Sequence, residues 1–208
     1  MSRRERLIFF FTFASNKNED ELKDEKRILG IDPGTTIMGF GVLRGISKPE
    51  LIDAGILDFR KHKGHYLKLK AVYESASKLF DKYKPDELAI EAPFFGKNVQ
   101  SMLKLGRCQG IIMALALSRS IPVFEYSPRK VKLAITGNGS ASKEQLSIMV
   151  QQIFQVKTVF EKYDASDAAA VALCHFYAMK SIVSTSKSNN WKDFLEKNQN
   201  RIYKTPSR

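Results

Sequence analysis

Short apolar runs that end in turn residues predict three strands in the first third of the chain. Arg27–Asp32 ends at Asp-Pro-Gly, and Ile37–Leu43 and Leu51–Phe59 follow, with the turn residues of Gly45–Pro49 between them. Runs of this length bounded by Gly and Pro are typical of strands, and short turns join antiparallel neighbours. The pattern therefore predicts an antiparallel meander of three strands.

Helical spacing then begins and alternates with two further strands. Apolar residues fall on one face of Tyr66–Tyr83, and Pro85 ends that helix. The later elements are strands at Leu88–Glu91 and Pro122–Tyr126, and helices at Lys97–Ser118, Pro128–Ile135, Lys143–Phe154 and Ala165–Ile182. This order predicts the α/β fold class, with a mixed five-stranded sheet of three antiparallel strands and then two parallel ones, flanked by helices.

The charge of the chain indicates a polyanionic partner. Lys and Arg number 34 against 22 Asp and Glu, a net charge of +12 in 208 residues. An N-terminal extension at 1–27, expected to be disordered, carries +1, and a basic C-terminal tail at 184–208 carries +4. The domain at 28–183 therefore keeps +7, which is typical of nucleic-acid binders. Charge alone leaves open a basic protein without such a partner.

Apolar runs and cysteines restrict the location of the protein. Hydrophobic residues make up 43% of the chain, enough for a core, but the longest apolar run, Leu7–Ala14, has only 8 residues. A membrane span needs about 18, so we expect no membrane association. Cys108 and Cys174 fall in predicted helices without the spacing of a zinc site. Free buried thiols suit the reducing cytoplasm.

Four carboxylates stand where elements end or begin. Asp32 ends the first strand, Glu91 ends the fourth, and Asp164 and Asp167 open the last helix, three apart on one face. If the first and fourth strands are parallel neighbours, all four can converge at one edge of the sheet. Such a cluster needs a cation, and hard oxygen ligands suit Mg²⁺ or Mn²⁺. Two such ions can promote phosphodiester hydrolysis.

Each acid also has a structural interpretation. Asp32 before Pro-Gly is compatible with an ordinary turn, and Asp164 and Asp167 with an N-cap and a first-turn acid of a helix. Glu91 is poorly explained by stability, because burying an unpaired charge is costly.

Longer motifs carry a resemblance to a known family. Ile28–Gly34 with Gly39–Val42, Ile90–Asn98 with Leu105–Gly110, Pro122–Lys132 with Gly137–Lys143, and Asp164–Ala172 strongly resemble the RuvC family of Holliday junction resolvases. The resemblance runs in order from Arg27 to Ser181, which is far more specific than any single motif.

The resemblance implies an RNase H-like fold and a homodimer that cuts four-way DNA junctions by paired symmetric nicks in recombination and repair. It also implies Mg²⁺, two ions per active site with Mn²⁺ as a substitute, and a branch-migration motor of the RuvA and RuvB type as partner. The catalytic, metal-binding residues carried over are Asp32, Glu91, Asp164 and Asp167, with Lys143 as a basic neighbour that offsets charge on the phosphate.

DNA contacts are expected around the acids. Phe94 follows the acidic strand end, where an aromatic ring can stack on an unpaired base, although Phe94 or its neighbour Phe95 can also belong to the core. Lys132 and Lys143 fall where the family carries important basic residues. Lys97, Lys104 and Arg107 form a stripe on the long helix, which is otherwise a solvated face. His62, His65 and His175 are assigned no role.

Three other functions stay open from sequence. Asp32–Thr36 also resembles the phosphate loop of actin-like ATPases and sugar kinases, but those enzymes enclose ATP between two large domains. A catalytically inactive DNA-binding module conflicts with four intact acids. An RNase H-like nuclease acting on RNA is disfavoured only by Phe94, Lys132 and Lys143.

Overall fold

The computed structural model describes residues 25–93, 98–156 and 163–185, of which 181–185 are described as backbone only. Contacts divide the chain into two units, Met1–Phe176 and Tyr177–Arg208. The sheet and all described candidate site residues belong to the first unit. The predicted positions of Phe94 and Lys97 lie outside the described residues.

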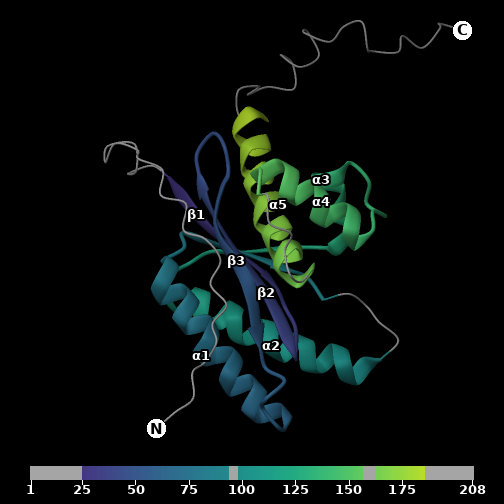
Figure 1. The fold of residues 1–208 in the computed structure, drawn as a ribbon. Coiled ribbons are helices and arrows are strands. Elements are labelled where there is room, and N and C mark those ends of the chain that lie inside the picture. The colour runs from purple at the N-terminus through teal and green to yellow at the C-terminus, as the bar shows by residue number, and fades with distance from the viewer. Residues whose placement is uncertain (1–24, 94–97, 157–162, 186–208) are drawn as a thin grey trace, which may run out of the picture. The chain divides into compact units, whose positions relative to one another are not determined.

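Five strands form one mixed sheet, as predicted (Figure 1). The strands are β1 (Lys26–Asp32), β2 (Ile37–Gly45), β3 (Glu50–Asp58), β4 (Glu87–Glu91) and β5 (Val123–Tyr126), in the spatial order β3-β2-β1-β4-β5. The first three pair antiparallel, whereas β4 runs parallel to both β1 and β5. The carboxyl ends of β1, β4 and β5 therefore share one edge of the sheet.

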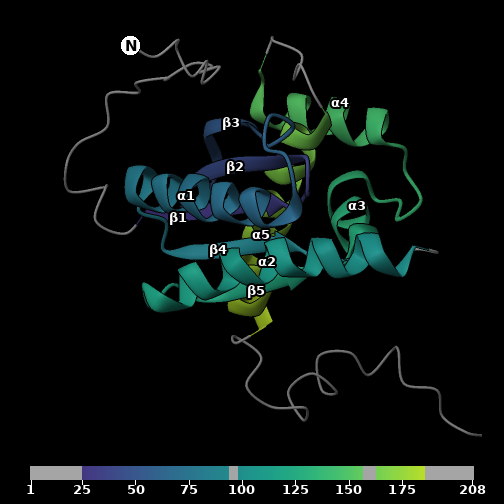
Figure 2. The ribbon, with the colours of Figure 1, turned by 90° about the horizontal axis from the view of Figure 1, so that it is seen from below.

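Five helices accompany this sheet. They are α1 (His65–Tyr83), α2 (Val99–Ser118), α3 (Pro128–Thr136), α4 (Lys143–Phe154) and α5 (Tyr163–Thr185). Figure 2 shows α1 and α2 side by side along one face. Residues of α5 up to Phe176 pack on the opposite face, against the glycines of β1 and β2. This is the layered α/β architecture that the order of elements predicts.

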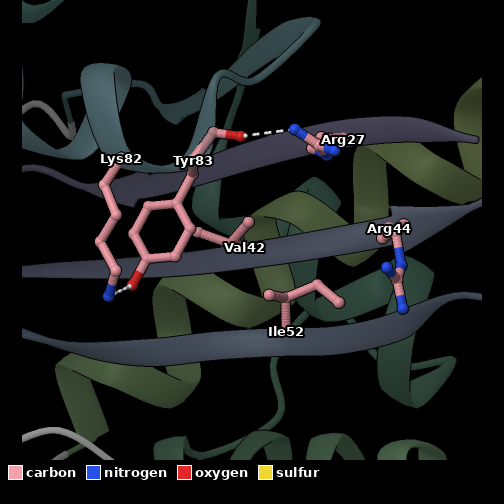
Figure 3. Close-up of a pocket in the computed structure, with 6 residues that line it drawn as sticks. All are labelled: Arg27, Val42, Arg44, Ile52, Lys82 and Tyr83. Atoms are coloured by element: carbon pink, nitrogen blue, oxygen red, sulfur yellow. Dashed lines mark hydrogen bonds between the residues drawn. The ribbon is translucent and has the colours of Figure 1, made fainter. Parts of the chain in front are cut away.

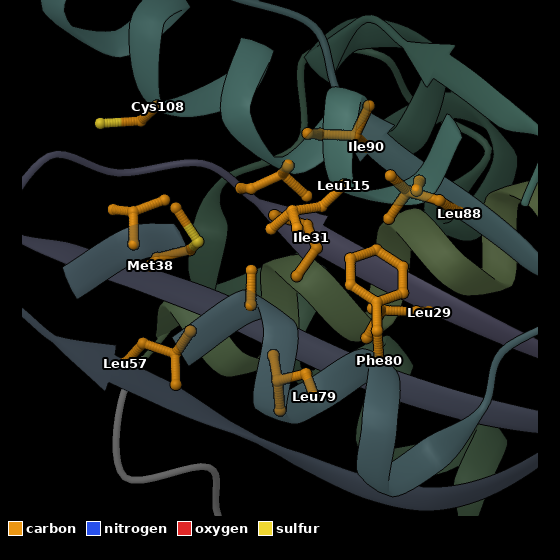
Figure 4. Close-up of a cluster of buried hydrophobic side chains, with 14 of the residues drawn as sticks. Leu29, Ile31, Met38, Leu57, Leu79, Phe80, Leu88, Ile90, Cys108 and Leu115 are labelled. Carbon is orange, nitrogen blue, oxygen red and sulfur yellow. The ribbon is translucent and has the colours of Figure 1, made fainter. Parts of the chain in front are cut away.

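The main core lies between the sheet and the first two helices. Leu29 and Ile31 of β1 point into it and are completely buried, and Phe80 of α1 is 2% exposed beside them (Figure 4). Ile112 of α2 is completely buried in the same cluster. The period-2 alternation of β1 sends its other residues to the α5 face. Cys108 is buried in this core as a free thiol, and Cys174 is a buried free thiol of α5.

Glycines on the α5 face allow a very close helix–sheet approach. A Cβ atom on Gly39 would lie 1.9 Å from the backbone oxygen of Asp164, and one on Gly30 would lie 2.3 Å from that of Ala168. Real Cβ atoms do not come this near, so glycine is required at both positions. The contact at Gly39 fixes the first turn of α5 beside the carboxyl end of β1.

Candidate active site

The register of two parallel strands places Asp32 beside Glu91. Ile31 of β1 pairs with Ile90 of β4, so the next residue on each strand is a carboxylate at the same edge of the sheet. Both side chains are partly buried. An apolar run followed by an acid on each strand is the local sequence that produces this pair.

The first turn of α5 adds two acids to the same edge. Asp164 is partly buried, and Asp167 is only 6% exposed. One oxygen of Asp167, Oδ2, lies 3.0 Å from Nζ of Lys143, the first residue of α4. The other oxygen, Oδ1, is buried and has no hydrogen-bond partner in the part of the chain that the structure describes. A buried carboxylate oxygen without a partner is costly, and it points to a missing ligand.

Burial and mutual repulsion raise the pKa values of these acids. Burial, followed by the charges of Glu91 and Asp167, raises the pKa of Asp32 to about 8. Burial and the charge of Asp167 likewise raise the pKa of Glu91 to about 7. Burial also raises the pKa of Asp167, against the opposing effect of Lys143. The negative charge of each acid therefore opposes ionisation of the other acids, unless a cation lies nearby.

Two of the expected basic residues lie beside the acids. Burial alone would lower the pKa of Lys143, but its hydrogen bond to Asp167 and the charges of the surrounding acids raise it above the ordinary value. Lys132 of α3 is partly buried and favours the charged forms of Glu91 and Asp167. Ser142 and Gln145 form a capping box at the start of α4, which fixes Lys143 as the first residue of that helix.

Lys104 and Arg107 belong to a different group. Both are exposed on α2, and their charges act on His65 at the start of α1 together with that of Lys68. The stripe expected on the long helix therefore continues onto α1.

The sequence alone indicates no role for His175, and the structure shows that it is a structural residue. Its ring is buried, with Nδ1 2.7 Å from the Tyr126 hydroxyl and Nε2 2.6 Å from a carboxylate oxygen of Glu87. This satisfied network ties α5 to β4 and β5.

A pocket of about 220 Å³ lies away from the acids, where β1 begins and β2 ends. Figure 3 shows its lining residues, which are Arg27, Val42, Arg44, Ile52, Lys82 and Tyr83. Arg44 lies 2.9 Å from Glu50, and Lys82 lies 3.4 Å from Asp53. Because these cations are already paired, we assign the pocket no role in binding.

The acids fit a divalent cation by their chemistry. Within residues 25–93, 98–156 and 163–185, no group of three or more His, Cys, Asp or Glu side chains is already arranged to hold a metal ion. The unpartnered Asp167 oxygen and the raised pKa values nevertheless indicate a cluster that lacks positive charge. Carboxylate oxygens are the ligands that Mg²⁺ and Mn²⁺ prefer. Asp32, Glu91, Asp164 and Asp167 would hold such an ion.

Comparison with known proteins identifies the family. The family model described as crossover junction endodeoxyribonuclease RuvC matches residues 28–175. The chain belongs to the RuvC family. RuvC of Bacteroides fragilis is 56% identical over 181 residues, which cover 86% of this chain and 96% of that protein. RuvC of Christiangramia forsetii is 48% identical, over 91% of this chain and 99% of that protein.

A solved RuvC structure shares the fold. Thermus thermophilus RuvC in complex with Holliday junction substrate superimposes with a TM-score of 0.69 at 29% identity, covering 75% of this chain and 96% of that one. The RNase H-like fold predicted from sequence is thereby confirmed. Membership of this nuclease family decides against the ATPase and kinase alternative, and it implies use of a divalent metal.

Proposed function

We propose that the chain hydrolyses phosphodiester bonds at the centre of four-way DNA junctions, with Asp32, Glu91, Asp164 and Asp167 holding two Mg²⁺ ions. The observation that carries this proposal is the parallel register of β1 and β4, which sets two carboxylates side by side where α5 brings two more. Membership of the RuvC family supplies the class of DNA substrate.

The chain's own residues would orient the reaction. Divalent ions at such a cluster activate water and stabilise the departing oxygen, and Mn²⁺ can replace Mg²⁺. Lys143, held by Asp167 and kept charged, offsets negative charge on the phosphate. Lys132 holds positive charge beside Glu91.

DNA binding rests on the basic domain around these acids. Lys97, Lys104, Arg107 and Lys132 hold backbone phosphates, which sets affinity and register rather than sequence preference. Phe94 stacks on a base opened at the junction centre.

Paired symmetric nicks need two active sites, and α2 offers a surface for a second copy. Val99 is 64% exposed and Leu103 is 53% exposed on α2, and Leu117 near its end is 62% exposed. Between them a Cβ atom added at Gly106 or at Gly110 would meet nothing within 4 Å. These five residues recur at a spacing close to a heptad, which is typical of a helix–helix seam. A homodimer built on this seam has two-fold symmetry, like the junction.

The protein works in the cytoplasm beside a branch-migration motor of the RuvA and RuvB type. None of the described helices combines the length and apolar character needed to cross a membrane. The free thiols of Cys108 and Cys174 are suited to a reducing compartment.

A cleavage assay tests the proposed function. The full chain is incubated with a four-way junction, a linear duplex of the same sequence and an RNA–DNA hybrid, with Mg²⁺, with Mn²⁺ and with EDTA. The proposal predicts paired nicks in the junction alone, dependent on either metal. Equal cleavage of the linear duplex or the hybrid would contradict it.

A further inference from the structure

The connection from β3 to α1 is strongly basic. The segment from Phe59 to Lys70 contains five Lys and Arg residues and no Asp or Glu. It comprises the loop after β3 and the first turns of α1, which begins at His65. Most of its side chains are exposed. Such a run needs counter-charges, either from the protein or from a partner.

The segment starts at the same edge of the sheet as the acids. Asp58, the last residue of β3, pairs with Ile37 at the beginning of β2, and Asp32 of β1 pairs with Gly39 two residues further on. The amide of Phe59 also donates to the oxygen of Thr36, at 2.8 Å. Since β2 alone separates β3 from β1, the loop begins about 10 Å from Asp32 across the sheet.

Protein carboxylates neutralise only part of this charge. Arg60 donates from Nε to Asp58 at 3.0 Å, and Lys70 lies 3.7 Å from Glu74. The remaining basic residues, Lys61, Lys63 and Lys68, have no carboxylate partner among the residues that the structure describes.

Packing of α1 on α2 adds two more cations. His65 has a pKa lowered by burial and then by the charges of Arg107, Lys104 and Lys68, so all three lie close to its ring. Its Nε2 atom is buried and makes no hydrogen bond to any described residue. We call the set Lys61, Lys63, Lys68, Lys104 and Arg107 the arm surface. Lys68, Lys104 and Arg107 thus surround His65, and Lys61 and Lys63 are exposed on the loop that leads into the same end of α1. Repulsion between neighbouring cations is relieved when an anion binds.

We propose that the arm surface binds the phosphate backbone of a junction arm, away from the bond that is cut. This proposal rests on the proposed function and adds Lys61, Lys63 and Lys68 to the DNA-binding residues. Double-stranded DNA carries about one negative charge per 1.7 Å of axis, so a duplex leaving the acidic edge presents many phosphates to the loop. Lysines on a loop contact phosphates as point charges and read no sequence.

The test compares two variants of the full chain with the same loss of charge. Lys61→Gln, Lys63→Gln and Lys68→Gln are combined in one protein. The control combines Lys48→Gln, Lys78→Gln and Lys84→Gln, which are exposed lysines away from the acidic edge. Affinity for a four-way junction is measured in EDTA over a series of salt concentrations, with long arms and with arms shortened to a few base pairs.

Loss of three phosphate contacts should reduce the slope of log affinity against log salt by about 2.7, at roughly 0.9 per contact. We expect this change for the arm-surface variant on long arms, little change on short arms, and a wild-type slope for the control on both. Equal slopes for the two variants would overturn the proposal, as would unchanged binding of the arm-surface variant, which would instead indicate a protein partner for these lysines. Wild-type cleavage of the junction, measured alongside in Mg²⁺, shows separately whether the proposed function holds.

Discussion

At the scale of single residues, Asp167 connects the acidic and basic parts of the candidate site. One of its oxygens contacts Lys143, and the other is buried without a partner. A side chain placed for helix capping alone would face solvent or backbone amides, so this burial favours the ligand role over the structural one. Asp32 and Glu91 share its environment, since burial and neighbouring charge raise their pKa values as well.

The raised pKa values predict how the stability of the metal-free protein depends on pH. Asp32 has a folded pKa of about 8, while an unfolded Asp titrates near about 4. The folded state therefore binds more protons, and this contribution to stability is fully present below about pH 4 and is lost as the pH rises through 8. Asp32→Asn removes the titrating group, so its melting temperature should fall less between pH 5 and pH 8.

Thermal melts in EDTA check this. At pH 8 the Asp32→Asn protein should melt several degrees above the wild type, because one pKa unit corresponds to about 1.36 kcal/mol. Added Mg²⁺ should narrow the difference by stabilising only the wild type. If the melting temperatures of the two proteins differ by the same amount at pH 5 and at pH 8, the electrostatic coupling is refuted.

Lys143 should matter for chemistry more than for DNA binding. In Lys143→Gln, Asp167 loses the cation at 3.0 Å and the phosphate loses an offsetting charge. We expect cleavage to fall by about 100-fold or more, the scale of a lost transition-state donor, and junction affinity to fall only slightly. Single-turnover cleavage and gel shift on the same preparation measure both. Lys78→Gln, an exposed lysine of α1, is the control and should behave as wild type in both assays.

At the scale of elements, the site depends on how closely α5 approaches β2. Gly39 meets the backbone of Asp164, and Gly41 meets that of Ala169. The helix that carries two of the acids is therefore positioned by residues with no side chain. A search of the sequence for reactive side chains does not find this role, because glycine has none.

Gly39→Ala should disturb the acids, whereas Gly45→Ala should not. Both glycines lie in β2, and a Cβ atom would clash at either position. On Gly39 it would lie 1.9 Å from the backbone oxygen of Asp164, and on Gly45 it would lie 2.2 Å from that of Lys48. Both variants should melt at lower temperature. Only Gly39→Ala should lose most cleavage when assayed well below its melting temperature, since it displaces the start of α5. Equal specific activities of the two folded variants would show that the position of α5 is not critical.

Strands and helices were predictable because their signals are local. Each strand is an apolar run between turn residues, and the acids at two strand ends follow directly from those runs. The contact of Lys143 with Asp167 was not predictable from spacing alone, because it depends on how α4 packs beside α5. The same holds for the arm surface, whose cations come from a loop, from α1 and from α2. The choice between stacking and core roles for Phe94 stays a prediction, because that residue lies outside the described part of the chain.

At the scale of the whole molecule, the proposed paired nicks require two copies acting on one junction. The exposed seam of α2 is apolar at Leu103 and free of side chains at Gly110. Such a stripe is compatible with close helix packing against a second copy and poorly explained by solvent exposure. Lys104 of the arm surface follows Leu103 directly on the same helix.

Leu103→Glu should separate the copies. Two buried carboxylates in a symmetric seam repel and lose hydration, so the variant should sediment as a monomer at micromolar concentration, where the proposed homodimer predicts a dimeric wild type. Junction nicks should become single and unpaired. Analytical ultracentrifugation and a cruciform plasmid, which separates single from paired nicks, measure the two effects. The exposed Leu133→Glu of α3 is the control, and a dimeric Leu103→Glu protein would place the interface elsewhere.

The central claim is that the acids serve chemistry while the basic surfaces hold DNA, and Asp167→Asn tests it most directly. The substitution keeps the size of the side chain and removes one negative charge facing the phosphates. Junction affinity in EDTA or Ca²⁺ should stay equal or rise, and cleavage in Mg²⁺ should fall by orders of magnitude, with partial recovery at raised Mn²⁺. Cleavage at the wild-type rate would contradict the account and leave Asp167 with a role in helix structure alone.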